Sequence, residues 1–418
     1  HEEKDVRLEN LRQLMIKIND GELPRPKTGN DVNNHIHTSY SFSPYSPTRA
    51  VWMAYQSGLA TAGIMDHDSI SGAEEFIEAG KIARIATTIG VECRVDFSKT
   101  PLAGRRINNP DQDSIAYMTL HGLPHTQIET IKEYFKPYQE YRNQRNRKMV
   151  ERINELTRQA ELSLDFDKHV VPLSQWEEGG SITERHILYA LSLRLIELFR
   201  KGEALLSYLN EQLGLNINDK IHGLLSDLDN PHYEYDLLGL LKGEMVASFY
   251  IDATDECPDV KDVIALSKEV GAICGYAYLG DVGNSVTGDK KAQKFEDDYL
   301  DELFDVLKRL KFQAVTYMPS RNTPAQLDRL RALCEEHGFF QISGEDINSS
   351  RQSFVCTAMR GEKFKNLFDS TWALVGHELV STEDVSKGLF TEETIELYPD
   401  LKERIQVYKK IGLNKSSR

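Results

Sequence analysis

The chain has 418 residues with a formal net charge of −15, and 40% of its residues are hydrophobic. This composition is typical of a soluble globular protein. The negative charge argues against non-specific binding to duplex DNA, which needs a basic face. The length predicts one large domain with an insertion, or two domains.

The cysteine pattern and the lack of long apolar runs bear on location. Five cysteines are scattered through the chain and none forms a Cys-x-x-Cys pair, which fits a reducing compartment better than a disulfide framework. No apolar run approaches the ~20 residues needed to span a bilayer. The sequence also begins without the apolar segment of a secretory signal. We therefore expect a cytoplasmic protein without membrane segments.

The first part of the chain combines a helix with a repeated strand–helix pattern. Residues 1–20 are amphipathic, so 1–29 is expected to be a helical segment on the outside of the next domain, or alternatively a contact between two copies. Thr48 and Gly58 suit the N-cap and C′ positions of a helix. Across residues 30–124 the pattern predicts strands at 33–38, 61–65, 87–91 and 115–120, with helices at 48–58 and 71–81.

The alternation stops after residue 124 and returns near residue 262. The segment 125–261 is predicted to be helical, with its main helices over 141–161 and 183–200, and to be inserted between the fourth and fifth strands. The first of these helices carries a basic run, made of Arg142, Arg145, Arg147, Lys148, Arg152 and Arg158. Its simplest interpretation is a solvated helix face. A face for phosphate or RNA is the alternative, although few aromatic residues accompany it.

The second part, 262–360, resumes the strand–helix pattern. It predicts strands at 270–278, 313–317 and 338–343, helices at 295–310 and 324–337, and a helix-rich extension at 361–418. Alternating strands and helices favour a parallel α/β sheet or barrel. In such folds the catalytic groups lie at the carboxyl ends of the strands.

The sequence Asn34-His35-Ile36-His37-Thr38, on the first of these strands, carries the strongest site signal. Two histidines at i and i+2 on a strand point to the same face and can bind one metal together. An isolated His-x-His pair is more often an ordinary pair of surface or core residues. Further metal-binding side chains at later strand ends favour a metal site, and they are His67, Glu92, His121 and Asp346.

Taken together, these stretches resemble the PHP family (polymerase and histidinol phosphatase), whose members are metal-dependent phosphoesterases with a distorted (β/α)7 barrel. The resemblance covers roughly residues 30–124 and 262–360. It rests on an ordered series of motifs: His35-Ile36-His37-Thr38, Asp66-His67-Asp68-Ser69, Gly90-Val91-Glu92, His121, Ala277-Tyr278-Leu279 and Ser343-Gly344-Glu345-Asp346-Ile347-Asn348. It implies the same distorted, TIM-like α/β barrel here, with a helical insertion between the fourth and fifth strands.

The family pattern also implies a set of metal ligands, with Glu92 as the bridging carboxylate: His35, His37, His67, Glu92, His121 and Asp346. Three further ligand positions of the family differ here. Ser41-Phe42-Ser43 lacks the expected Asp or His, and Tyr278 and Asn348 each replace a His. We therefore expect one firm metal, a second that depends on metal concentration, and no stable third. Weaker candidate ligands are Tyr278, Asn348 and Asp281.

Neutral imidazoles and carboxylates suit divalent Zn, Mn or Fe, and such a metal activates water near neutral pH. The resemblance therefore implies hydrolysis of a phosphomonoester or phosphodiester in a small phosphorylated metabolite or nucleotide. Glu92, Asp346 and His67 would be the catalytic residues. Nucleic acid is expected only as a nucleotide or strand end. The alternatives are hydrolysis of another bond, such as an amide or cyclic ester, and a catalytically weakened barrel with a binding or structural role.

Position and resemblance together imply two further roles. Asp66 is expected to orient a ligating histidine rather than to bind metal directly. Some PHP relatives carry an insertion at the same point as 125–261, which resembles a lid, and Glu184-Arg185-His186-Ile187 loosely matches its Arg-x-His element. This match implies that Arg185 and His186 bind substrate. Alternatively, both lie in a first helical turn and His186 is an ordinary half-buried residue.

Overall fold

The computed structural model describes residues 3–160, 162–283 and 293–416. Its centre is a seven-stranded sheet in sequence order, made of β1 (Val32–Ile36), β2 (Thr61–His67), β3 (Ala86–Asp96), β4 (Ile115–His121), β5 (Ile273–Ala277), β6 (Ala314–Tyr317) and β7 (Phe340–Ser343). The chain after β7 returns to β1, where the His37 amide donates to the Ile347 carbonyl over 2.9 Å. This contact nearly closes the sheet, which confirms the distorted α/β barrel.

One strand contradicts the expectation of a parallel sheet. β4 runs antiparallel to both β3 and β5, whereas the other neighbouring pairs are parallel. Antiparallel neighbours need no helical crossover, and residues 97–114 accordingly join β3 to β4 without a regular helix. As a result, His121 at the carboxyl end of β4 lies opposite Gly90, two residues before Glu92 on β3.

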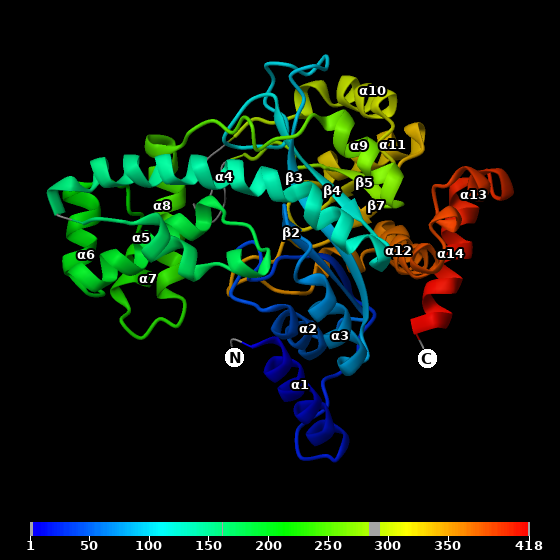
Figure 1. Ribbon diagram of the computed structural model, residues 1–418, viewed down its shortest axis with the longest axis horizontal. Helices are drawn as coiled ribbons and strands as arrows, with labels where there is room; N and C mark the ends of the chain where they lie inside the picture. Colours follow the sequence, from blue (N-terminus) through cyan, green and yellow to red (C-terminus); the bar gives the residue numbers. More distant parts are fainter. Residues whose placement is uncertain (1–2, 161, 284–292, 417–418) are drawn as a thin grey trace.

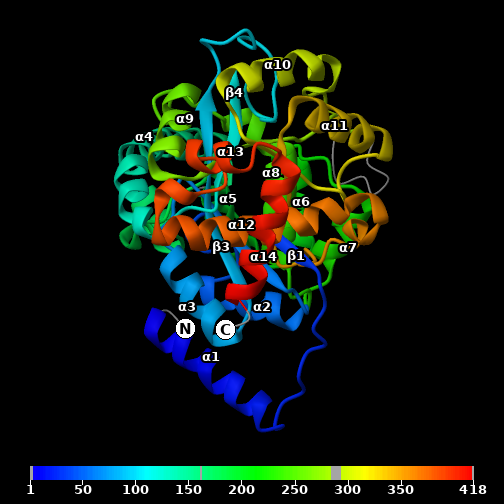
Figure 2. The ribbon, with the colours of Figure 1, turned by 90° about the vertical axis from the view of Figure 1, so that its right-hand side faces the viewer.

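Helices surround the barrel (Figures 1 and 2). They are α2 (Pro47–Gln56), α3 (Ala73–Ala83), α9 (Val260–Val270), α10 (Leu300–Leu310), α11 (Pro324–His337) and α12 (Lys365–Glu383), followed by α13 (Glu392–Leu397) and α14 (Leu401–Ser416). The first helix, α1 (Lys4–Asn19), packs outside α2 and α3, and its Arg7 forms a 2.6 Å ion pair with Glu75 of α3. None of the helices in these described ranges is apolar over a length that would cross a bilayer.

Several helix boundaries differ from those predicted. Ser46, rather than Thr48, caps α2 by accepting from the Arg49 amide, while Thr48 donates its hydroxyl to Glu75 over 2.6 Å. The predicted helix at 295–310 begins only at residue 300. The first inserted helix, α4 (Ile128–Leu156), begins well before residue 141 and contains a proline in its interior. Gly58 has the positive φ expected of a C′ glycine.

The segment between β4 and β5 is helical and has its own apolar cluster. Besides α4 it contains α5 (Glu184–Phe199), α6 (Glu203–Ser207), α7 (Asp219–Ser226) and α8 (Tyr233–Phe249). Figure 1 shows these helices together on one side of the barrel. Their cluster includes Met149, Leu191 and Leu241, and it also takes in Phe42 from the loop after β1. The inserted helices therefore pack against the barrel at the strand end that carries the predicted ligands.

The crossing of α12 and α14 leaves no room for a side chain at Gly376. A Cβ atom there would lie 2.0 Å from the Tyr408 carbonyl oxygen. We expect Gly376→Ala to lower the free energy of unfolding by about 2 kcal/mol, because one helix must move. Gly239→Ala in α8 is the matched control: its Cβ meets nothing within 4 Å, and it should raise stability by up to about 1 kcal/mol. Urea denaturation of both variants measures this, and equal effects would contradict the close-contact argument.

Candidate metal centre

Three ligand-type side chains converge at the barrel end that β1 and β3 share. One nitrogen of His35, one of His37 and one oxygen of Glu92 all lie within 4.8 Å of one another, and all three residues are buried. The Nε2 atoms of His35 and His37 stand 3.6 and 3.8 Å from Glu92 Oε2. The His-x-His spacing on β1 aims both rings inward, and Glu92 extends toward them from the long strand β3.

Two more predicted ligands join this group. His67, at the end of β2, places Nδ1 3.1 Å from Glu92 Oε2. Asp346, after β7, places Oδ1 3.2 Å from His37 Nε2, and its side chain remains 41% exposed. The structure therefore brings together His35 and His37 of β1, His67 of β2, Glu92 from within β3, and Asp346 after β7.

His121 lies on β4 opposite Gly90, two residues before Glu92 on β3. It is 2% exposed, and burial together with the nearby charge of His35 lowers its pKa to about 3. Its Nε2 is buried without a hydrogen-bond partner. A neutral imidazole with an unpartnered nitrogen suits a metal. The antiparallel direction of β4 sets this register, which the assumption of parallel strands did not anticipate.

The protonation states of the group also suit a divalent metal. Burial, and then the charge of His37, lower the pKa of His67 well below its usual range, so this ring is neutral. Burial opposes the charge on Asp346, but the hydrogen bond and charge of His37 outweigh it and hold the pKa of that carboxyl well below its usual range. Neutral imidazole and ionised carboxylate are the forms that bind Zn, Mn and Fe.

A hydrogen-bond relay fixes the tautomer of His37. The Ser41 hydroxyl donates to Asp66 over 2.6 Å and lies 3.2 Å from His37 Nδ1. Since the hydroxyl proton is directed to Asp66, Nδ1 of His37 donates to Ser41. The ring is thereby oriented so that its Nε2 faces Asp346 and Glu92, the other members of the donor group. Asp66 thus acts on His37 through Ser41, in line with the orienting role expected for it.

In the sequence, Ser41 stands out only because the segment Ser41-Phe42-Ser43 lacks the Asp or His ligand expected there. Its spacing of four residues from His37 is a local signal that could have suggested the contact. The neighbouring Phe42 has a φ of 105° and stacks edge-on against His186 of α5, with ring centroids 5.0 Å apart. The position where the family carries a metal ligand therefore contacts the inserted helices instead.

The three weaker candidate ligands all have other partners. The Tyr278 hydroxyl donates to Asp297 over 2.6 Å, and burial raises its pKa far above the ordinary phenol value, so it is not a phenolate. Asp281 forms a 2.7 Å ion pair with Lys294. Asn348 donates its amide to Asp346 over 2.7 Å and accepts from Arg185 over 2.5 Å. Metal coordination by any of them stays a prediction.

Arg185 and His186 lie in the first turn of α5 but face different surroundings. Arg185 reaches the barrel, where Asn348 links it to Asp346. His186 is only 1% exposed, and its Nδ1 accepts from the Thr183 amide over 3.0 Å in a capping box. His186 is therefore more buried than the alternative interpretation, an ordinary half-buried residue, predicts. The structure gives His186 a capping role, and its contact with substrate stays a prediction.

The basic run on α4 is only partly a solvated face. Arg142 and Arg145 are buried, so that interpretation is wrong for these two residues. Arg142 binds Asp68 over 2.5 Å and Glu184 over 2.9 Å. We call the whole group the ion-pair network: Arg94, Arg142, Arg145, Asp68, Glu184 and Glu256. It joins the inserted helices to β3 and to the turn after β2, beside the predicted ligand His67.

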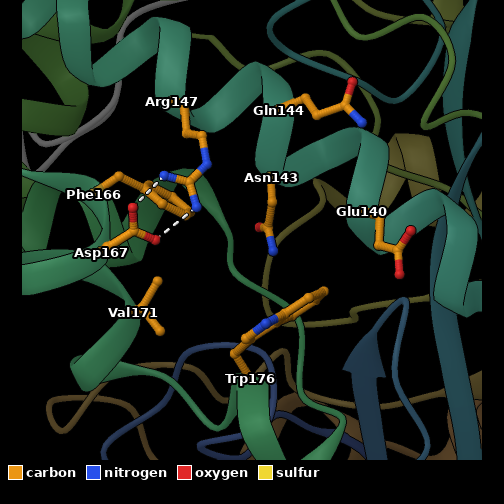
Figure 3. A pocket seen from close by; sticks show the side chains of 8 residues that line it. All are labelled: Glu140, Asn143, Gln144, Arg147, Phe166, Asp167, Val171 and Trp176. Carbon is orange, nitrogen blue, oxygen red and sulfur yellow. Dashed lines mark hydrogen bonds and ion pairs between the residues drawn. The ribbon is translucent and has the colours of Figure 1, made fainter.

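Arg147, in the same run, faces a separate hollow on the insertion. Figure 3 shows this hollow, about 340 Å³ in volume, with Trp176 and Phe166 among its lining residues. The guanidinium of Arg147 lies over the Phe166 ring, 4.5 Å from its centroid, and binds Asp167 over 2.5 Å. Asp167 balances Arg147 and Glu140 also lines the hollow, so it offers no unbalanced positive charge for a phosphate.

Comparisons with known proteins agree with this geometry. The model of the PHP domain matches residues 33–206. One similar solved structure is a candidate metal-dependent phosphoesterase from Bifidobacterium adolescentis, with a TM-score of 0.51 and 18% identity over 80% of this chain and 96% of that chain. Another is an amidohydrolase from Chromobacterium violaceum, with a TM-score of 0.51 and 15% identity over 78% of this chain and 90% of that chain. The comparison with curated protein sequences gives no match.

These similarities are low in sequence, and the two solved structures show the fold alone. The family match begins at the strand that carries His35 and His37, and it includes His67 and Glu92. Together with the buried donor group, it indicates a hydrolase that depends on a divalent metal. Residues 33–206 of the chain thus match the PHP domain.

Proposed function

We propose that this protein is a metal-dependent phosphoesterase acting on a small phosphorylated molecule or a nucleotide. The observation that carries the proposal is the buried convergence of His35, His37 and Glu92, extended by His67 and Asp346. A bound divalent metal would supply Lewis acidity toward a phosphoryl oxygen and a nucleophilic water at neutral pH.

The donors divide unequally between metal positions. His35, His37, Glu92 and Asp346 would hold the firm metal, and Glu92 with His121 would hold a second one that depends on concentration. A third has only His67 left of its expected ligands, because Ser41-Phe42-Ser43 contains no Asp or His and Asn348 replaces the last histidine. Zn, Mn and Fe all suit this donor set.

The chain's own residues have separate tasks in this proposal. Asp346 stays ionised beside His37, so its negative charge would favour the binding of a metal cation. His67 is neutral; with its Nδ1 directed to Glu92, its Nε2 can accept a proton from the attacking water. Arg185 lies next to Asp346 through Asn348, so it can bind an anionic oxygen of the substrate.

We further propose that the segment 125–261 acts as a lid. Its Ser181 hydroxyl donates to the His67 carbonyl over 2.6 Å, and its Gln139 amide to the Asp68 carbonyl over 2.7 Å. These contacts lie at the strand ends that carry the ligands, as a lid requires, and a lid would limit substrates to small molecules or strand ends. The segments 1–29 and 361–418 would then be outer additions to a barrel formed by 30–124 and 262–360.

The function is tested by loading the protein with Zn, Mn or Fe and measuring both metal content and hydrolysis of phenyl phosphate. We expect at least one metal per chain by elemental analysis and metal-dependent release of phosphate. Matched amide and cyclic-ester substrates test the alternative suggested by the metal chemistry. Bound metal without turnover of any substrate in the panel would favour the catalytically weakened barrel.

Replacing Arg185 with alanine should raise KM about tenfold for an anionic substrate and change kcat less. The reason is the loss of a charge-assisted hydrogen bond beside the metal centre. Steady-state kinetics of the metal-loaded enzyme measures both constants. Arg152→Ala is the control, since this exposed arginine of α4 bonds to the Tyr250 carbonyl, which is also in the insertion. An unchanged KM in Arg185→Ala would leave Arg185 with a structural role only.

A further inference from the structure

An aromatic cluster lies where the inserted helices meet the barrel. Phe42, in the loop after β1, has its ring centroid 5.7 Å from that of Tyr189 in α5 and 5.9 Å from that of Tyr235 in α8. The two tyrosine rings are 5.3 Å apart. Phe42 is buried, whereas each tyrosine remains partly accessible to solvent. The cluster therefore presents aromatic surface at this junction in addition to packing the insertion against the barrel.

The loop after β1 holds the cluster next to the metal centre. Ser41, the residue before Phe42, donates its hydroxyl to Asp66 over 2.6 Å and lies 3.2 Å from His37 Nδ1. Both contacts are to buried partners, so the position of this loop is well fixed. Phe42 is thus one residue away from a side chain that contacts a predicted metal ligand.

Both helices of the cluster are bound to the segment that follows β7. From α5, Arg185 donates to Asn348 over 2.5 Å, and Asn348 donates to Asp346 over 2.7 Å. From α8, Asp236 forms a 2.7 Å ion pair with Arg351. These contacts hold α5 and α8 against the segment that carries the predicted ligand Asp346.

The two tyrosines lie directly beside these anchoring side chains. Tyr189 follows Arg185 by four residues, so it lies one turn further along the same face of α5. Tyr235 immediately precedes Asp236 in α8. A small molecule that binds the metal centre and Arg185 through a phosphate can therefore direct its organic part toward the two rings.

The tyrosine hydroxyls are available for further hydrogen bonds. Neither the Tyr189 nor the Tyr235 hydroxyl bonds to a partner among residues 3–160, 162–283 and 293–416. A tyrosine that is partly buried usually pairs its hydroxyl, because the ring suits an apolar contact and the hydroxyl a polar one. The pair thus offers aromatic surface together with two free donors, which suits a planar ring with polar atoms at its edge.

We propose that Tyr189 and Tyr235 form a stacking subsite for the base of a nucleotide substrate. This inference rests on the proposed function, because it takes the phosphate to lie on the metal centre. A nucleobase stacks on aromatic side chains whichever base it is, and its edge carries nitrogen and oxygen acceptors. The substrate class is then a nucleoside phosphate. The two tyrosines become specificity-determining residues, since the metal centre itself contacts only the phosphate.

The test measures how strongly three compounds inhibit hydrolysis of phenyl phosphate by the metal-loaded enzyme: adenosine 5′-monophosphate, adenosine 3′-monophosphate and ribose 5-phosphate. All three carry a phosphate on ribose, but only the first two carry a base. We expect the inhibition constant of at least one adenosine phosphate to be about tenfold lower than that of ribose 5-phosphate, the effect of one stacking contact. Equal constants for all three compounds would overturn the subsite and leave the proposed function standing.

Substitutions of the two rings assign the preference to them. In Tyr189→Leu and in Tyr235→Leu the ratio of inhibition constants should fall toward one, whereas Tyr189→Phe and Tyr235→Phe keep the ring and should retain most of the preference. Tyr141→Leu is the matched control, because Tyr141 is a 43% exposed tyrosine of α4 in the same insertion; it should keep the wild-type ratio. The two leucine variants alter separate helices, and thermal unfolding by circular dichroism shows which of them is folded. A wild-type ratio in a folded leucine variant of each tyrosine would overturn the assignment.

If metal-loaded protein does not hydrolyse phenyl phosphate, the proposed function fails, and calorimetric titration with the same three compounds tests the subsite separately. Tighter binding of an adenosine phosphate than of ribose 5-phosphate, with the difference lost in Tyr189→Leu or Tyr235→Leu, supports the subsite. Equal binding of all three compounds, or binding of none, overturns it.

Discussion

Glu92→Ala should abolish both metal binding and hydrolysis. Oε2 of Glu92 lies 3.6, 3.8 and 3.1 Å from nitrogens of His35, His37 and His67. It is therefore the one carboxylate shared by all three imidazoles in the described group. Without it, the rings lose one of the two carboxylates that would offset a divalent cation, and the remaining one, Asp346, contacts only His37 among them. Both proposed metal positions include Glu92, so both should be lost.

Elemental analysis after dialysis against trace Zn measures the metal, and phosphate release measures hydrolysis. Glu92→Gln keeps the size of the side chain and removes its charge, so it separates the loss of a ligand from a change in packing; it should also lose metal. Glu177→Ala, an exposed glutamate of the insertion, should keep the wild-type metal content. Retention of a stoichiometric metal in Glu92→Ala would show that the centre is built on other residues.

Glu256→Ala should lower the free energy of unfolding by about 3–5 kcal/mol, the range for breaking a buried ion pair. The Glu256 side chain is only 3% exposed; it accepts from Arg145 over 2.6 Å and also from Arg94. Its removal leaves two buried guanidinium groups with one fewer counter-charge. The free-energy cost of desolvating these cations is then uncompensated. This cost is larger than the net stabilisation that the intact ion pair provided.

Urea denaturation of the metal-free protein measures this effect without a contribution from metal binding. Asp167→Ala is the matched control, because it breaks the ion pair with Arg147 on the same insertion, where the two side chains are 64% and 48% exposed. A solvated pair contributes at most about 1 kcal/mol. Similar effects of the two substitutions would show that the ion-pair network is accessible to water and contributes little to stability.

The local sequence contained enough information to predict that the central candidate ligands meet. His35 and His37 share a strand face by their i, i+2 spacing, and His67 lies two residues after the next apolar run. Parallel strands of a barrel end at one rim, so residues at these ends meet without any knowledge of the packing. The orienting role of Asp66 stays a prediction, and its path to His37 through Ser41 is visible only in the structure.

Other features depended on contacts between distant segments. The direction of β4 is set by how it pairs with β3 and β5, which its own seven residues do not specify, and it decides that His121 lies opposite Gly90. Arg142 and Arg147 belong to the same basic run on α4, yet Arg142 is buried and Arg147 is exposed. The difference lies in Asp68, 74 residues away in the sequence, whose carboxylate pairs with buried Arg142.

Thus the sequence by itself determined an α/β sheet or barrel, the helical insertion and the type of candidate metal ligand, because strand and helix periodicity and donor chemistry are local properties. Tertiary structure alone decided which charges are buried and which polar groups bind one another, as when Arg185 of the insertion reaches Asn348 of the barrel. Burial and charge pairing depend on segments brought together by the apolar core, and no spacing within one segment encodes them.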